Sequence, residues 1–180
     1  MIFQETPLAG AFVIDLEPRT DDRGFFARAW SQDELEAHGL DSRASQANIG
    51  VSTRAGTLRG MHYQEAPFAE VKIVRCTAGR IHDVIVDLRP GSPTHRGWFG
   101  IELSASNRSA LYVPAGFAHG YLTLTDDAEC WYIASVPYAP TAARGVRHDD
   151  PAFGIEWPIP VAVISDADRA WPDYPTGGTS

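Results

Sequence analysis

Short runs of β-branched and aromatic residues recur from about residue 45 onward, and this repetition limits the fold more than any other feature. The runs are spaced about ten residues apart, with no helical period between them. Residues that favour turns separate them, as in Pro90-Gly91-Ser92 and Ser106-Asn107-Arg108. The pattern is typical of an antiparallel sandwich or barrel of the jelly-roll kind, so we predict a mainly β protein. The predicted strands are Lys72–Cys76, Ile81–Leu88, Trp98–Leu103, Leu111–Val113, His119–Leu124 and Trp131–Val136.

One short helix is predicted near the N-terminus. Ser31 and Glu34 form a capping-box pattern, and Gly39 is placed to end the helix. We find no repeat, low-complexity tract or linker that would split the chain, so we expect a single domain over residues 1–180. The segment from Trp157 is rich in proline and aspartate, and we expect it to wrap the barrel and to fray from about residue 174.

Composition and charge exclude several classes of function. A hydrophobic fraction of 44% with 21% charged residues is that of a globular protein. The apolar runs fall short of the roughly 18 residues that a membrane span needs, and the N-terminus has no secretion pattern, so we expect a cytoplasmic protein. A net charge of -8 disfavours nucleic acid as a partner. Cys76 and Cys130 lack the spacing of a disulfide framework or metal finger, so we expect buried free thiols.

Lysine is nearly absent from this chain. Fourteen of the fifteen basic residues are arginine, and the single lysine, Lys72, indicates a place that needs a compact ammonium group. Strand alternation puts Lys72 on one face with Val74 and Cys76, and places His119 and Tyr132 among small or apolar residues in the same way. Because unpaired polar groups are costly to bury, these side chains indicate a pocket inside the barrel. The alternative is that these strand faces are exposed to solvent.

Two short motifs bear on whether the chain binds a metal ion. The segment Pro114–His119 has the P-x-G-x-x-H spacing of the second cupin motif, in which the histidine is often a metal ligand. The first cupin motif needs a His-x-His pair, but the matching place here reads His62-Tyr63-Gln64. A catalytic metal normally has three good protein ligands, so we predict no bound metal and histidines free for acid–base chemistry. A weak mixed site of His62, Gln64, Glu70 and His119 is the alternative.

Five stretches bring basic, acidic and aromatic residues together, namely Asp21–Phe26, Arg59–Gln64, Glu70–Lys72, Gly116–Gly120 and Ile164–Asp168. In this order and at these spacings, they resemble the dTDP-4-dehydrorhamnose 3,5-epimerase family, whose fold is a cupin-type β-barrel. The resemblance covers roughly residues 5 to 173 and is most specific at Leu58–Gln64, Ile81–Arg89, Tyr112–Gly120 and Gly154–Pro158.

The resemblance implies a role for each matching residue. His62 would be the general base, Asp168 its orienting partner, Tyr132 the general acid on the opposite face of the sugar, and Lys72 the stabiliser of an enolate oxygen. The positions expected to line the sugar, diphosphate and nucleotide sites are Arg59, His119, Gln46, Asn48, Gln64, Tyr138, Arg23 and Phe25. The resemblance also implies a homodimer, no cofactor, and a nucleotide-diphosphate 4-keto-6-deoxysugar as substrate.

The chemistry fits these residue types. A 4-keto group acidifies the adjacent C–H bonds, so inversion needs a base, an enolate stabiliser and an acid on the other face. The expected reaction is therefore epimerisation at C3, at C5 or at both carbons.

The chain departs from the family pattern at Arg28, Ala143 and Ala167, where acidic residues and a lysine are usual. These positions belong to the nucleotide end, so CDP- and GDP-linked sugars remain open. The same fold and residues would also suit a C5-only epimerase, a ketoisomerase or a non-catalytic sugar-nucleotide-binding cupin. A metal-dependent cupin oxygenase is the function that a bound metal would favour instead.

Overall fold

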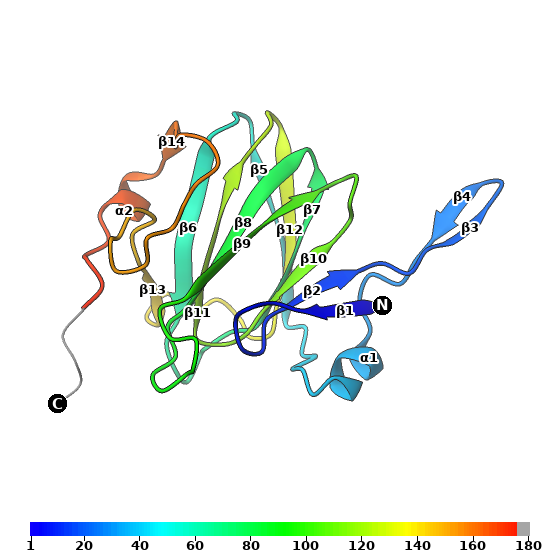
Figure 1. Cartoon of the computed structure of the whole chain (residues 1–180), viewed down its shortest axis with the longest axis horizontal. Coiled ribbons are helices and arrows are strands. Elements are labelled where there is room, and N and C mark those ends of the chain that lie inside the picture. The colour runs from blue at the N-terminus through cyan, green and yellow to red at the C-terminus, as the bar shows by residue number, and fades with distance from the viewer. Residues whose placement is uncertain (176–180) are drawn as a thin grey trace.

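The computed structural model of the protein describes residues 1–175. Two antiparallel sheets form its body (Figure 1). The predicted fraying at residues 176–180 lies outside the described residues. The strands of the first sheet, in spatial order, are β1 (Ile2–Glu5), β2 (Phe12–Asp15), β10 (Ala110–Val113), β7 (Lys72–Ala78), β12 (Ala128–Ala134) and β5 (Gln46–Ser52). Those of the second are β13 (Ala143–Gly145), β6 (Thr57–Gln64), β11 (Phe117–Thr123), β8 (Arg80–Asp87) and β9 (Trp98–Ser104).

Three further strands and two short helices complete the part of the chain that the structure describes. The strands β3 (Arg19–Asp21) and β4 (Gly24–Phe26) form a hairpin that projects from the body (Figure 1). At the other end of the molecule, β14 (Val163–Ile164) runs parallel to β6 and leads into α2 (Asp166–Arg169). The segment after Trp157 therefore returns along β6, and the chain is still held at Tyr174, whose N–H donates to Asp150 at 2.6 Å.

The main core lies between the two sheets. It takes Val74 and Leu111 from the first sheet and Ile85 and Leu103 from the second, all fully buried. These residues come from the predicted strands, which confirms the mainly β, cupin-type fold class. Cys76 and Cys130 also lie in this core as free thiols, as expected.

The predicted helix is confirmed as α1 (Gln32–Ala37), with the Ser31 hydroxyl accepting from the N–H of Glu34 at 3.4 Å. Gly39 follows with φ +69°, the left-handed conformation that ends many helices. The strand predicted at Trp131–Val136 is β12, which begins and ends earlier than predicted, at Ala128 and Ala134. Its first residues are alanine and glutamate, which have weak strand preference.

No helix within residues 1–175 is long and apolar enough to cross a membrane.

The pairing of β6 with β11 contains a bulge that orients the functional side chains. His62 pairs with His119, but Arg59 pairs with Tyr121, so three residue steps on β6 oppose two on β11. Residues three apart on a regular strand point to opposite faces, and the extra residue lets Arg59 and His62 face the same side. The backbones approach closely at this point, since a Cβ on Gly60 would lie 2.5 Å from the Cα of Gly120.

We predict that Gly60→Ala destabilises the protein by on the order of 3 kcal/mol, because the added methyl group overpacks against β11 and φ is +137° there. Urea unfolding measures the loss. Gly39→Ala is the control, because it also replaces a glycine with positive φ, but a Cβ at this position would meet no atom within 4 Å. It should lower the free energy of unfolding by only about 1 kcal/mol. Equal losses in the two variants would contradict the close contact.

Candidate active site

A cavity with two lobes opens where β5, β6, β7 and β12 meet the returning segment of β14 and α2. The first lobe has a volume of about 560 Å³ and includes Arg59, His119 and Tyr121 in its wall. The second has a volume of about 640 Å³ and includes Asn48, Tyr138 and Trp171. Both lobes are lined by four residues that the sequence predicted to be catalytic, namely His62, Lys72, Tyr132 and Asp168.

His62 and Asp168 form a close pair although 106 positions separate them in the sequence. The His62 Nε2 lies 2.6 Å from Asp168 Oδ1. Burial favours a raised pKa for Asp168, but the hydrogen bond and charge of His62, with the Gly60 N–H and Ser165, outweigh it and hold the pKa below its ordinary value. The carboxyl group is therefore ionised near neutral pH and can only accept, so Nε2 carries the proton and Nδ1 is the nitrogen able to take another.

The helix α2 places Asp168 against β6. The Ser165 hydroxyl accepts from the N–H of Asp168 at 3.0 Å and caps the helix. A second hydrogen bond, from the Gly60 N–H to Asp168 Oδ2 at 3.4 Å, joins the carboxylate to the β6 backbone. The side chain of Asp168 is thus fixed from both sides, as an orienting partner requires.

Lys72 and Tyr132 come from neighbouring strands of the first sheet and face the same interior. Lys72 pairs with Ala134 across β7 and β12, and the small alanine leaves room for the long side chain. Burial raises the pKa of Tyr132, with smaller contributions from Glu70 and Cys130, so the phenol keeps its proton beyond neutral pH. Because Lys72 is only 8% exposed, the interpretation of these strand faces as solvent-exposed is wrong.

The first lobe contains a second histidine–carboxylate pair. His119 Nε2 lies 2.8 Å from Asp83 Oδ1, and both side chains are buried. Arg59 is held by the Ser52 hydroxyl at 3.1 Å and the Val51 carbonyl oxygen at 2.9 Å. Within the described residues it makes no ion pair with a carboxylate, so its charge is available to an anionic ligand.

The second lobe brings together most of the other predicted binding residues. Gln46 accepts from the Tyr138 N–H at 3.0 Å, and Tyr138 itself is exposed. The buried Asn48 Nδ2 has no hydrogen-bond partner between residues 1 and 175 and is free to donate to a ligand. Gln64 also lines this lobe, but its amide group is occupied by the Ala139 N–H at 2.6 Å and the Phe68 carbonyl oxygen at 3.1 Å, so here it holds a loop.

Arg23 and Phe25 do not join the other predicted residues. Both lie on the β3–β4 hairpin, at the opposite end of the molecule from α2 (Figure 1). Arg23 pairs with Asp21 on the same hairpin. Of the three departures from the family pattern, Ala143 and Ala167 line the second lobe, whereas Arg28 pairs with Glu34 at 2.7 Å outside it.

The four residues considered as a weak metal site each have a partner already. Glu70 pairs with Lys72 at 3.0 Å, and the two histidines pair with carboxylates as described above. From Met1 to Pro175, no group of three or more His, Cys, Asp or Glu side chains is arranged to hold a metal ion.

Sequence reasoning missed Asp83 as the partner of His119. The available signal was its position, because it is a charged residue within the apolar strand sequence Ile81–Leu88. A buried carboxylate requires a partner, and β11 lies next to β8. Glu70 was considered as a metal ligand and as part of the Glu70–Lys72 stretch, but its pairing with Lys72 was not predicted. The available signal was the spacing, since residues two apart on extended backbone point to the same side.

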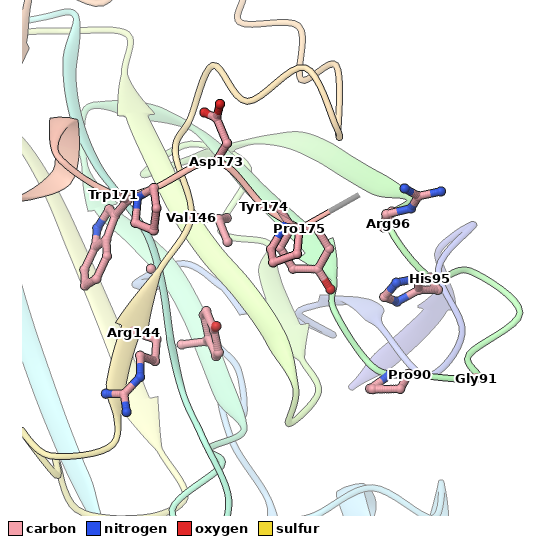
Figure 2. Close-up of a pocket in the computed structure, with 13 residues that line it drawn as sticks. Pro90, Gly91, His95, Arg96, Arg144, Val146, Trp171, Asp173, Tyr174 and Pro175 are labelled. Carbon is pink, nitrogen blue, oxygen red and sulfur yellow. The ribbon is translucent and has the colours of Figure 1, made fainter. Parts of the chain in front are cut away.

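A further hollow of about 640 Å³ adjoins the second lobe, between the loop around His95 and the segment Trp171–Pro175. Figure 2 shows Trp171 and Arg144 on one side of it and His95 and Arg96 on the other. It shares Tyr63, Arg144 and Trp171 with the second lobe but contains none of the four residues common to both lobes. We therefore place the candidate active site in the two-lobed cavity.

The fold and the site together define a class: a cupin-like β-barrel whose cavity holds groups suited to proton transfer. The sequence model of the dTDP-4-dehydrorhamnose 3,5-epimerase family matches residues 5–175. The chain therefore belongs to this family, and it is an isomerase.

Three relatives illustrate the similarity. The dTDP-4-dehydrorhamnose 3,5-epimerase of Sinorhizobium fredii is 41% identical over 96% of this chain and 89% of its own. The dTDP-4-dehydrorhamnose 3-epimerase of Streptomyces niveus is 38% identical over 90% of this chain and 78% of its own. The crystal structure of the Bacillus anthracis 3,5-epimerase with TDP and PPi bound superposes with a TM-score of 0.92 and 38% identity, covering 96% of this chain and 99% of that one.

We predict that Asp168→Asn lowers the free energy of unfolding by on the order of 1–3 kcal/mol near neutral pH, because it removes a charged hydrogen-bond partner of His62. The folded pKa of Asp168 lies below its unfolded value, so its contribution is present above about pH 4 and is lost as the pH falls through the folded pKa. The difference between wild type and variant should therefore shrink on acidification.

Urea unfolding near pH 7 and near pH 3 measures this difference. Asp166→Asn, on the exposed side of the same helix, is the control and should change stability little at either pH. A difference for Asp168→Asn that stays constant between the two pH values would contradict the assigned hydrogen bond between His62 and an ionised Asp168.

Proposed function

We propose that this protein epimerises a dTDP-linked 4-keto-6-deoxyhexose at C3 and C5. The observation that carries the proposal is the joint placement of the His62–Asp168 pair, Lys72 and Tyr132 at the junction of the two lobes. The family of the chain supports the reaction type, and the TDP in the Bacillus anthracis structure supports a thymidine nucleotide.

Proton transfer at a carbon beside the keto group explains each residue type. His62 Nδ1 removes the proton, and Asp168 stabilises the imidazolium ion that forms. The electrons move to the keto oxygen, where the Lys72 ammonium group stabilises the enolate. Tyr132 then donates its phenolic proton to the carbon. His62 lies on β6 of one sheet and Tyr132 on β12 of the other, so removal and return occur from opposite walls and invert the carbon.

The binding groups divide between the diphosphate and the base. Arg59 supplies a positive charge without a carboxylate partner among the described residues, and the free Asn48 amide supplies a donor, so both suit phosphate oxygens. His119 has its Nε2 bound to Asp83, so its Nδ1 is free to accept a hydrogen bond from a sugar hydroxyl group. The exposed ring of Tyr138 suits stacking on the base, and Gln46 holds its backbone.

A homodimer would bring Arg23 and Phe25, the two predicted binding residues that lie far from the cavity of their own chain, to the cavity of a second copy. The hairpin with Arg23 and Phe25 projects away from the chain's own site, and it exposes apolar rings, with Phe26 at 77% exposure. Covering those rings against a second copy removes the apolar surface from water. The hairpin of each copy then reaches the nucleotide bound in the other.

Epimerisation at C3 alone is the second candidate. The Streptomyces niveus relative, with 38% identity, carries the name of a 3-epimerase, so close similarity does not fix the number of carbons inverted. Incubation with dTDP-4-keto-6-deoxyglucose in deuterated water, followed by NMR, distinguishes the candidates. Deuterium at C3 and C5 supports the proposal, whereas deuterium at C3 alone supports the second candidate. Turnover of only the CDP- or GDP-linked analogue would contradict the nucleotide, and no exchange with any of them would favour a binding protein.

We predict that His62→Ala abolishes both inversion and deuterium uptake, because no enolate forms without the base. Tyr132→Phe should instead retain deuterium uptake but lose most inversion at a carbon to which Tyr132 donates, since His62 can return a proton to the original face. The same NMR assay measures both quantities. Tyr174→Phe, outside the two lobes, is the control. Normal inversion in Tyr132→Phe would show that another residue is the acid.

We also predict that two defective variants restore activity when mixed. In a mixed dimer of Arg23→Ala/Phe25→Ala with His62→Ala, one site combines an intact His62 with an intact hairpin from the other copy. After joint refolding, activity at low substrate concentration should rise above that of either variant alone. Each mixed dimer has one intact site of two, so it should reach at most about half the activity of a wild-type dimer. Light scattering should show a dimer at micromolar concentration. A monomer, or no gain on mixing, would contradict the shared site.

A further inference from the structure

Glu70 and Lys72 form a charge pair within the second lobe. The Lys72 Nζ lies 3.0 Å from Glu70 Oε1. The Glu70 side chain is only 13% exposed and the Lys72 side chain only 10%. Lys72 is the single lysine of the chain, and across residues 1–175 it pairs with no other carboxylate. The ammonium group therefore has one fixed anionic neighbour and keeps further donors for a ligand.

The backbone holds both members of the pair in place. Val71, between them, donates its N–H to the Ser135 hydroxyl at 2.8 Å, and its carbonyl oxygen accepts from the Ser135 N–H at 3.0 Å. Lys72 then opens β7 and pairs with Ala134. On extended backbone, residues two apart point to the same side, which brings both side chains into the lobe that Tyr132 also lines.

Stability alone does not account for this pair. Removing two charges from water offsets most of their attraction, and apolar residues of similar size are often at least as stabilising. The pair lines the same lobe as the phenol proposed as the acid, where a fixed charge affects the energy of proton transfer. Its position therefore indicates a role in the reaction.

We propose that Glu70 is a positioning residue of this site, holding the Lys72 ammonium group at one point of the wall and presenting a fixed negative charge to the Tyr132 phenol. The inference rests on the proposed function, because it takes the roles of Lys72 and Tyr132 from there. Glu70 itself exchanges no proton with the substrate.

The surroundings of Tyr132 agree with this role. Burial contributes most to the raised pKa of Tyr132, Glu70 comes next and Cys130 after it. The other ionisable groups that line the cavity around it are His62, Asp168, Lys72, His119, Arg59, Arg144, Tyr63, Tyr121 and Tyr138. Loss of the Glu70 charge lowers the pKa of the phenol, because a neighbouring anion disfavours the phenolate.

The experiment uses Glu70→Gln, Glu70→Asp and the control Glu102→Gln, which removes a carboxylate from the exposed Arg80–Glu102 pair on β9. Tyrosine labelled with ¹³C at Cζ is titrated by NMR without substrate, and Tyr132→Phe identifies the Tyr132 signal. The pH dependence of kcat for inversion is then measured for each folded variant, with circular dichroism as the check on folding.

We expect Glu70→Gln to shift the Tyr132 titration and the alkaline limb of kcat together to lower pH, and to reduce kcat by on the order of tenfold to a hundredfold because Lys72 loses its anchor. Glu70→Asp keeps the charge but is one methylene shorter, so kcat should fall without a comparable shift of the titration. Glu102→Gln should match wild type in both measurements.

An unchanged Tyr132 titration in Glu70→Gln, or a loss of kcat in that variant without movement of the alkaline limb, would overturn the inference. If Glu70→Gln does not fold, wild-type kcat in Glu70→Asp would overturn it instead. The titration needs no turnover, so it decides the role of Glu70 even if the wild-type protein acts on none of the nucleotide sugars, a result that would overturn the proposed function alone.

Discussion

The pairing of β6 with β11 is the contact on which the site depends. Gly60 and Gly120 bring the two backbones closer than any side chain permits, and the bulge between them turns Arg59 and His62 toward one cavity. The same stretch of β6 receives α2, because the Gly60 N–H and His62 both bind Asp168. One irregular strand pair thus orients the candidate base and anchors the returning C-terminal segment.

The cavity follows a simple rule of charge. Three of its basic side chains each have their own carboxylate, in the pairs His62–Asp168, His119–Asp83 and Lys72–Glu70. Arg59 is bound by a hydroxyl and a carbonyl oxygen instead, and among residues 1–175 it has no acidic partner. In a chain with a net charge of -8, this leaves a local positive charge at the place where we propose that the diphosphate binds.

The sequence predicted the core strands, including β7, β11 and β12 of the cavity, but it did not predict the other strands that line the site. Runs such as Ile81–Leu88 are apolar because both of their faces are buried, and that composition is easily recognised. Neither β5 nor β6 was predicted, since their sequences, QANIGVS and TLRGMHYQ, carry polar groups that serve the cavity. The short α2 was also missed, although Ser165 precedes Asp168 at the capping distance. The four catalytic candidates came from the family resemblance. Simple alternation would put Arg59 and His62 on opposite faces of β6, and the bulge that turns both toward one cavity has no clear signature in composition.

The two alanines in the second lobe are best understood together. The family resemblance implies an acidic residue near Ala143 and a lysine at Ala167, and both alanines lie in the wall of the same lobe. Replacing one acid and one base by alanine removes opposite charges, so the net charge of the lobe is unchanged while its volume grows. The ion pair between Arg144 and Glu65, at 2.9 Å, remains at this edge. We therefore propose that recognition of the nucleotide base at this edge relies on shape and on the Tyr138 ring more than on charge, and this difference is separate from the four residues at the junction of the lobes.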